Sequence, residues 1–201
     1  IVFPRFKDLE RLNEEIYQDY IYLFSIDDER YYLVNEINRE LFRYFRRRQV
    51  VTKCWRKVNG VWCIKDIAFT DEWTEKDYVF LVSCLKNTVQ TGGMVSGAFL
   101  RNQLKGFVSV EAALFGGKKE YLDLSSIHVS EEMRGRGVGR ELFRIAKNWA
   151  KQHGAKKLYI SAHSAVESQA FYRAMGCVEA LEYNQGHVAK EPSDCQLECM
   201  V

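Results

Sequence analysis

The fold is decided by Val129-Ser130-Glu131-Glu132-Met133-Arg134-Gly135-Arg136-Gly137-Val138-Gly139-Arg140, in which three alternate glycines stand among arginines. The first four N–H groups of a helix have no partner within the helix, and the helix dipole adds partial positive charge beside them. Glycine has no Cβ and adopts positive φ, so a phosphate can approach the backbone closely. We therefore interpret this loop as a pyrophosphate site, and a simple strand-to-helix turn is the alternative.

Two common nucleotide motifs do not fit this loop. The chain lacks the Gly-Lys-Ser/Thr ending of a P-loop, and the glycine spacing differs from G-x-G-x-x-G. The sequence therefore indicates neither a Walker ATPase nor a dinucleotide-binding fold. The residues predicted to surround the anion, with the arginines adding forked charged donors, are Arg134, Gly135, Arg136, Gly137, Val138, Gly139 and Arg140.

The loop resembles the acetyl-CoA signature of the GNAT superfamily of N-acetyltransferases. Arg134, Gly137 and Gly139 satisfy its R/Q-x-x-G-x-G/A pattern in order, and residues 124–129 resemble the strand that precedes it. A second element of the family is similar to residues 164–177, a short helix with a tyrosine, Tyr172, four residues before a glycine. The resemblance covers residues 94–200.

Three positions depart from the family pattern. Glu131 replaces a frequent proline, Ala165 replaces a frequent asparagine seven residues before the tyrosine, and Cys177 replaces a phenylalanine. The missing asparagine removes one expected contact to pantetheine or backbone, whereas the phosphate loop and the tyrosine are unaffected.

The resemblance implies a fold of the α/β (α+β) class. We expect a central mixed, mostly antiparallel twisted sheet that is flanked by helices and splayed at the acetyl-CoA site. One domain is expected over residues 1–201, with residues 1–92 as a divergent N-terminal portion and residues 94–200 as the motif-bearing core.

The resemblance also implies a set of acetyl-CoA contacts. Backbone groups of Ile127, His128 and Val129 are expected to pair with pantetheine, and the Val129 N–H is expected to bind the oxyanion. Ser168, Phe171 and Tyr172 complete the predicted cofactor site. We expect acetyl-CoA as co-substrate and no metal.

Acyl transfer from a thioester to an amine needs an acid and a base. A tyrosine with a pKa of about 10 is suited to protonate the departing thiolate, and Tyr172 matches the family's general acid. The alternative is an aromatic that only fills space beside Phe171. For the base, Asp123 or Glu111 acting through water is our prediction, with His128 as a further candidate and a surface role as the alternative for each.

Hydrophobic periodicity predicts the remaining elements. Leu33, Ile37, Leu41 and Phe45 predict a helix from Asp28 to about Arg48. Its final arginines (46–48) are expected to be solvated, and contact with an acidic partner is the alternative. A capping box at Thr74 predicts a helix to about residue 89. Further strands are predicted over 95–100, 106–114, 121–129 and 157–162, a helix over about 142–150, and a closing hairpin of 177–183 with 195–200; the strands before and after the 142–150 helix are expected to be parallel.

A hairpin turn is predicted at Asn59-Gly60. In that register the numbers of facing residues sum to 119, so Cys63 opposes Arg56 rather than Cys54. Lys53 then faces Asp66, and Trp55 faces Ile64.

Composition limits the function classes. The chain has 201 residues, 47% hydrophobic and 28% charged, with a net charge of +2, which is too balanced for a nucleic-acid binder. No signal peptide or membrane span is evident, so we expect a cytoplasmic protein with no membrane partner. The cysteines lack a disulfide framework and are expected to be reduced and buried: Cys54, Cys63, Cys84, Cys177, Cys195 and Cys199. A zinc site from His187, Cys195 and Cys199 lacks ligand spacing, and we interpret the two cysteines as core.

The predicted function is acetyl transfer from acetyl-CoA to a primary amine of a small molecule, such as an amino-bearing antibiotic or metabolite. A non-catalytic acyl-CoA-binding or regulatory module and the acetylation of a protein amine are the alternatives. Residues 1–92 are expected to supply the acceptor pocket or a contact in a homodimer. Four acidic residues are either cation-attracting or solvated: Glu179, Glu182, Glu191 and Asp194.

Overall fold

Two sheets carry the fold, and one stretch of chain joins them. The computed structural model describes residues 35–201. In one sheet the strand order is β3 (Met94–Leu100), β4 (Gln103–Val110) and β6 (Ser126–Val129), all antiparallel. In the other the order is β5 (Tyr121–Asp123), β7 (Lys157–Ala162), β9 (Cys195–Met200) and β8 (Val178–Glu179), and only β5 and β7 are parallel. The predicted mixed, mostly antiparallel sheet is confirmed, as a sheet divided in two.

The division falls inside the stretch predicted as one strand, residues 121–129. The Leu124 N–H donates to the Tyr159 carbonyl of β7 at 2.9 Å, whereas the next N–H, of Ser125, donates to the Ser109 carbonyl of β4 at 3.1 Å. The parallel pairing with β7 therefore ends where β6 begins. Beyond this point β6 and β7 diverge, which is the splay that the family resemblance implied.

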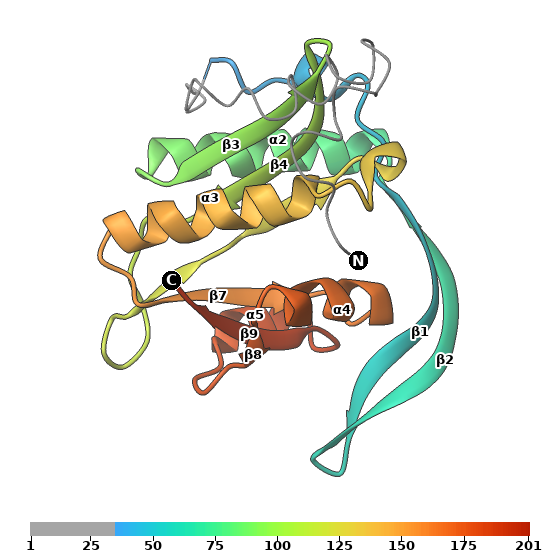
Figure 1. Ribbon diagram of the computed structural model, residues 1–201, viewed down its shortest axis with the longest axis vertical. Coiled ribbons are helices and arrows are strands. Elements are labelled where there is room, and N and C mark those ends of the chain that lie inside the picture. The colour runs from blue at the N-terminus through green and yellow to red at the C-terminus, as the bar shows by residue number, and fades with distance from the viewer. Residues whose placement is uncertain (1–34) are drawn as a thin grey trace, which may run out of the picture.

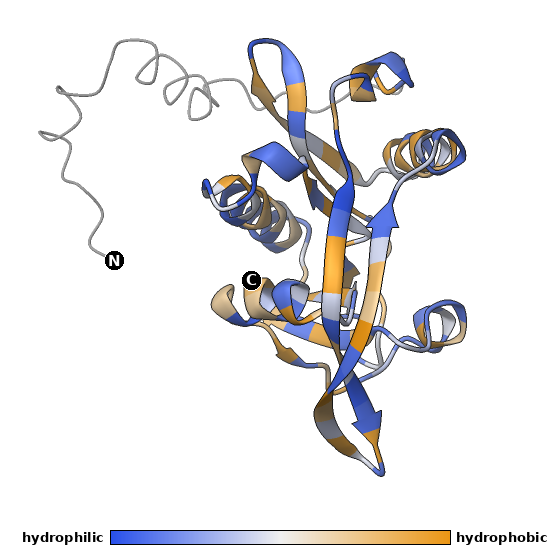
Figure 2. Cartoon of the chain, turned by 90° about the vertical axis from the view of Figure 1, so that its right-hand side faces the viewer, coloured by the Kyte–Doolittle hydropathy of each residue, from blue (hydrophilic) through white to orange (hydrophobic). Residues whose placement is uncertain are grey.

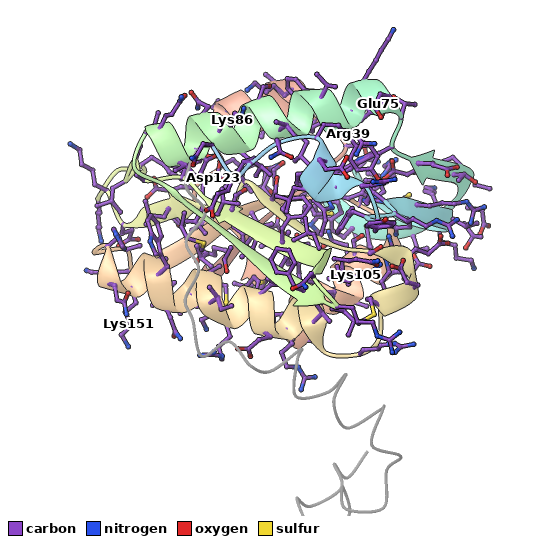
Figure 3. The ribbon with its side chains drawn as sticks, turned by 90° about the horizontal axis from the view of Figure 1, so that it is seen from above. Arg39, Glu75, Lys86, Lys105, Asp123 and Lys151 are labelled. Atoms are coloured by element: carbon purple, nitrogen blue, oxygen red, sulfur yellow. The ribbon has the colours of Figure 1, made fainter. Side chains whose placement is uncertain are left out.

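Helices cover both faces (Figures 1 and 2). The helices α3 (Val138–Gln152) and α4 (Val166–Ala174) lie on one face, where the largest buried cluster includes side chains of both. The helices α2 (Glu75–Gln90) and α5 (Gln185–Lys190) lie on the other. Seen from above, α2 and α3 run on opposite sides of β3 and β4 (Figure 3).

The predicted helix from Asp28 to Arg48 is wrong over its described part. Residues 28–34 lie outside the described residues, and from residue 35 the chain forms turns and a short 3-10 helix, Glu40–Phe42, before strand β1. Tertiary packing overrides the four-residue period, because Phe42 and Phe45 each contact Phe107 of β4 with ring centroids 5.4 Å apart. Ile37, Phe42 and Phe45 are all buried in a second apolar cluster, which also contains Leu81 and Leu85 of α2.

A long hairpin of β1 (Arg48–Val58) and β2 (Val61–Glu72) reaches from the α2 end of the molecule to α4, at the right of Figure 1. Its turn, Asn59-Gly60, has φ of +50° and +81°, as a two-residue hairpin turn requires. The predicted register is confirmed, with Cys63 opposite Arg56. The Lys53–Asp66 ion pair is also present, at 3.6 Å.

Other elements follow the sequence with small changes. Helix α2 begins after Thr74, whose N–H donates to the Asp77 carboxylate at 2.7 Å. The closing hairpin is shorter than predicted, since only Val178 and Glu179 pair with β9 and α5 is inserted between the two strands. All six cysteines are free as expected, but Cys84 is exposed and Cys63 is half-buried.

Candidate active site

The glycine loop leaves its backbone open. After β6 the chain forms a 3-10 turn, Glu131–Met133, and Gly137 then caps the N-terminus of α3 with φ +87°. Gly135 also has positive φ, and no heavy atom beyond the chain neighbours lies within 4 Å of the place where a Cβ would stand at Gly135 or Gly137. The three arginines Arg134, Arg136 and Arg140 are exposed. This open, cationic helix N-terminus fits a pyrophosphate.

Gly139 has a different role from the other two glycines. A Cβ at Gly139 would lie 3.2 Å from Cε2 of Phe171 and 3.6 Å from Cγ2 of Val129. Its lack of a side chain therefore lets α4 pack closely on the start of α3.

This packing brings the tyrosine helix to the glycine loop. Phe143 of α3 contacts Phe171 and Tyr172 of α4, with ring centroids 6.2 Å and 6.4 Å apart. Burial raises the pKa of Tyr172, and Cys177 and Asp194 nearby act in the same direction. The phenol therefore stays protonated at neutral pH.

Alternate residues of β6 point their main-chain N–H and C=O groups toward the splay between β6 and β7. The Ser130 N–H donates to the Lys105 carbonyl of β4 at 2.8 Å. Because hydrogen bonding alternates along an antiparallel strand, the main-chain groups of Ile127 and Val129 point away from β4. The Val129 carbonyl accordingly accepts a hydrogen bond from Nε of Arg134 at 3.3 Å.

His128 lies on the opposite face from these neighbours. Its ring contacts Trp73 and Phe107, with centroids 4.6 Å and 5.4 Å apart. Burial lowers the pKa of His128 to about 3, and the positive charges of Arg47 and Arg134 contribute. The neutral imidazole is therefore a weak base.

Asp123 and Glu111 are neighbours through the backbone, since the Glu111 N–H donates to the Asp123 carbonyl at 2.9 Å. Oδ2 of Asp123 lies 2.7 Å from Nε2 of His187, and this hydrogen bond raises the pKa of His187. Glu111 accepts a hydrogen bond from the Thr88 hydroxyl of α2 at 2.6 Å. No sequence pattern joins His187 to Asp123, because the two residues are 64 positions apart and meet only when α5 covers the sheet.

His187 is separated from Cys195 and Cys199, the two cysteines that were considered with it as zinc ligands. Cys195 and Cys199 belong to the buried cluster beneath α3, as their alternation predicted. His187 lies on the other face, stacked on Tyr159 with ring centroids 5.8 Å apart.

The four acidic residues divide by environment. Glu179 accepts hydrogen bonds from Lys57 at 2.6 Å and Trp62 at 3.0 Å, which fastens the hairpin to β8. Glu182 accepts the Gly117 N–H at 2.8 Å. Asp194 is half-buried beside Ser161, and its pKa is raised to about 6, first by burial and then by Glu191.

The β1–β2 hairpin packs against Ala165, the position where the family often has an asparagine. Ala165 is fully buried in a small cluster with Val51 and Cys54, and it forms a β-bridge with Cys54. The Trp55 N–H donates to the Ser164 carbonyl at 2.8 Å. An asparagine at 165 would have to bury its amide among these apolar side chains.

The prediction that Arg46, Arg47 and Arg48 are all solvated is wrong for Arg47, which is 8% exposed. Nη2 of Arg47 donates to Oδ2 of Asp71 at 2.6 Å, and its guanidinium lies 5.7 Å from the Trp73 ring centroid. The β1–β2 register brings Asp71 to the start of the hairpin, so a partner that the sequence did not indicate buries the charge.

Comparison with known families identifies the class of protein. A model of the acetyltransferase (GNAT) family matches residues 8–177. The match spans most of the chain and includes both motifs, so the chain belongs to the acetyltransferase (GNAT) family and is an acyltransferase.

Solved structures share the fold. A proposed streptothricin acetyltransferase from Bacillus anthracis strain Ames, solved with acetyl coenzyme A, superposes with a TM-score of 0.64 at 17% identity, over 86% of this chain and 96% of that chain. A nourseothricin acetyltransferase superposes with a TM-score of 0.58 at 18% identity, over 84% of this chain and 94% of that one. These likenesses confirm the mixed sheet flanked by helices.

One curated relative matches over a short stretch. The uncharacterized N-acetyltransferase YobR of Bacillus subtilis (strain 168) is 42% identical over 40 residues, which are 20% of this chain and 16% of that protein. Within residues 35–201, no helix is long and apolar enough to cross a membrane.

Proposed function

We propose that the protein transfers an acetyl group from acetyl-CoA to a primary amine of a small molecule. The observation that carries this proposal is the contact between the glycine loop and helix α4. The open glycine loop at the start of α3 lies next to the helix that holds the buried, protonated Tyr172.

The proposed donor site follows from this geometry. The exposed loop would hold the pyrophosphate, and the outward backbone groups of Ile127 and Val129 would pair with pantetheine. The main-chain groups of His128 face β4, so His128 would only position its two neighbours, and Ser168 and Phe171 would line the facing helix. Acetyl-CoA, when bound, supplies an acetyl group activated as a thioester.

Tyr172 is proposed as the general acid. Transfer releases a thiolate, which needs a proton, and a phenol that burial keeps protonated can donate it. The hydroxyl then regains its proton from solvent.

Asp123 or Glu111 is proposed to remove the proton from the amine through water. An alkylamine with a pKa of about 10.4 pays on the order of 4 to 5 kcal/mol to become neutral at pH 7. Asp123 ends β5 and Glu111 directly follows β4, and both carboxylates lie on the side of the sheet away from α3.

An amino-bearing antibiotic is one proposed acceptor. Two structural neighbours with the same fold are described as acetyltransferases of nourseothricin and streptothricin, and each is covered almost entirely. The acidic environment at Asp123, Asp194 and Glu191 also suits a cationic acceptor.

A panel of primary amines, tested with acetyl-CoA and a thiol-detecting reagent, tests the proposal. We expect amine-dependent thiol release and an acetylated amine by mass spectrometry. Tight CoA binding without turnover of any amine would instead support the non-catalytic module. Turnover restricted to peptide amines would support acetylation of a protein.

A further inference from the structure

Two buried side-chain atoms of opposite charge are left without partners. Within residues 35–201, the buried side-chain nitrogens and oxygens that lack a hydrogen bond are Nη1 of Arg47 and Oδ1 of Asp123. Such atoms are rare in native proteins, and each calls for an explanation such as a ligand. One of them is a cationic donor, and the other is an anionic acceptor.

Both atoms lie on the same side of the sheets. Asp123 pairs with Tyr159 and shares its face, whereas their neighbours Leu122 and Leu158 are buried in the cluster beneath α3. The view from above shows Asp123 between α2 and α3 (Figure 3). Asp123 therefore turns its carboxylate to the face away from α3, where α5 supplies His187.

Arg47 reaches the same face from the start of the hairpin. Its guanidinium lies over Trp73, and the Trp73 ring contacts His128, whose side chain points away from the α3 face. Arg47 also lowers the pKa of both His128 and His163. These histidines stand at the C-terminal ends of β6 and β7, so the guanidinium lies near the open end of the splay.

Each charged group is held in place by one partner and keeps one atom free. Asp71 holds Nη2 of Arg47 at 2.6 Å, and His187 holds Oδ2 of Asp123 at 2.7 Å. Both residues are fixed before any ligand binds, which reduces the entropy cost of binding.

We infer that the acceptor is a zwitterion whose ammonium binds Oδ1 of Asp123 and whose carboxylate binds Nη1 of Arg47. This inference rests on the proposed function and narrows its substrate class. His128 lies five positions after Asp123, and extended chain rises about 3.3 Å per residue. The two charges of the acceptor must therefore be well separated, as in an ω-amino acid or a short peptide rather than an α-amino acid.

The ligand side of the test uses the unmodified protein with CoA bound. We measure by calorimetry the binding of 4-aminobutanoate, 6-aminohexanoate and 8-aminooctanoate, each beside the alkylamine and the carboxylate of equal length. At the best length the amino acid should bind at least about tenfold more tightly than either analogue with one charge. Equal binding of amino acid and alkylamine, or no binding of the amino acids, overturns the inference.

Turnover separates this inference from the proposed function. Acetylation of alkylamines as fast as of amino acids would leave the proposed function intact and overturn the zwitterion. Absence of turnover with every amine would contradict the proposed function, and the calorimetric comparison would still decide the inference.

The protein side of the test uses Arg47→Gln and Asp123→Asn. Arg47→Gln should reduce the ratio of the amino-acid affinity to the alkylamine affinity to about one. The alkylamine affinity itself should stay unchanged. Asp123→Asn should weaken the amino acid and the alkylamine alike. Arg48→Gln, which removes a neighbouring guanidinium with a half-exposed side chain, is the matched control and should change neither.

CoA affinity without acceptor reports on the fold and on the donor site. The CoA affinity should be the same in all three variants. A tenfold loss of CoA affinity in Arg47→Gln would mean that Nη1 of Arg47 binds CoA, which would overturn the inference. If Arg47→Gln does not fold, Arg47→Lys keeps the charge and loses the fork, and it should lower the preference by a smaller factor.

Discussion

The donor side and the acceptor side of this site are built in different ways. The proposed donor side consists of two short stretches, residues 129–140 and 164–177, and would use mainly backbone groups, glycines and one tyrosine. The proposed acceptor side would use two pairs from four separate parts of the chain, Arg47 with Trp73 and Asp123 with His187. Chemistry common to the family is therefore local in sequence, whereas the groups that would select the acceptor depend on tertiary contacts.

The largest effect is expected at the donor side, for Tyr172→Phe. Loss of the proposed acid should reduce kcat about 10²- to 10⁴-fold with little change in CoA affinity, because the ring that packs on Phe143 remains. Steady-state thiol release and calorimetry measure the two quantities. Tyr183→Phe, which removes a hydroxyl bonded to Glu179, is the control, and an equal loss of kcat there would remove the special role of Tyr172.

The glycine loop is tested by two substitutions at opposite ends of α3. Gly137→Val should weaken CoA binding by more than about tenfold, because the side chain blocks the phosphate and strains a positive φ. Gly154→Val has the same strain at the other end, with φ +81° and open space around it. If both variants lose stability and neither loses CoA affinity, the loop is only a turn.

The substitution Ala165→Asn tests whether the hairpin still tolerates the residue that the family often has at this position. Ala165→Asn should lower the free energy of unfolding by about 1–3 kcal/mol, because it buries an amide among Val51 and Cys54. Urea denaturation measures this value. Ala174→Asn, on the exposed side of α4, should cost much less, and equal costs would show that the buried cluster tolerates the family's residue.

The smallest effect concerns the Asp123–His187 pair. The pKa of His187 is raised in the folded state, so its stabilisation is complete below the unfolded value near 6.5 and is lost as pH rises through the folded value. His187→Asn should therefore cost about 1 kcal/mol more at pH 6 than at pH 9. Denaturation of both proteins at the two pH values measures this difference. A cost independent of pH would mean that the imidazole acts by packing on Tyr159 alone.

Several elements of the fold were predictable because their signals are local. The Asn59-Gly60 turn, the Thr74 cap and the apolar stripe of α3 each depend on residues close in sequence, and the structure confirms them. The helix predicted to Arg48 failed because Phe42, which lies outside the predicted stripe, packs on Phe107 together with Phe45. The predicted strand 121–129 was one pattern in sequence, but its pairing partners change at Leu124 and Ser125.

The sequence by itself determined the family and the donor motifs, because a phosphate cradle is made of adjacent backbone groups and a tyrosine at a set spacing. The catalytic and cofactor residues named from it stay predictions. Only the tertiary structure decided that Arg47 is buried, that His187 meets Asp123 and that the hairpin fills the place at Ala165. Such contacts join residues far apart in the chain, and their free energy comes from burial and pairing that no local pattern records.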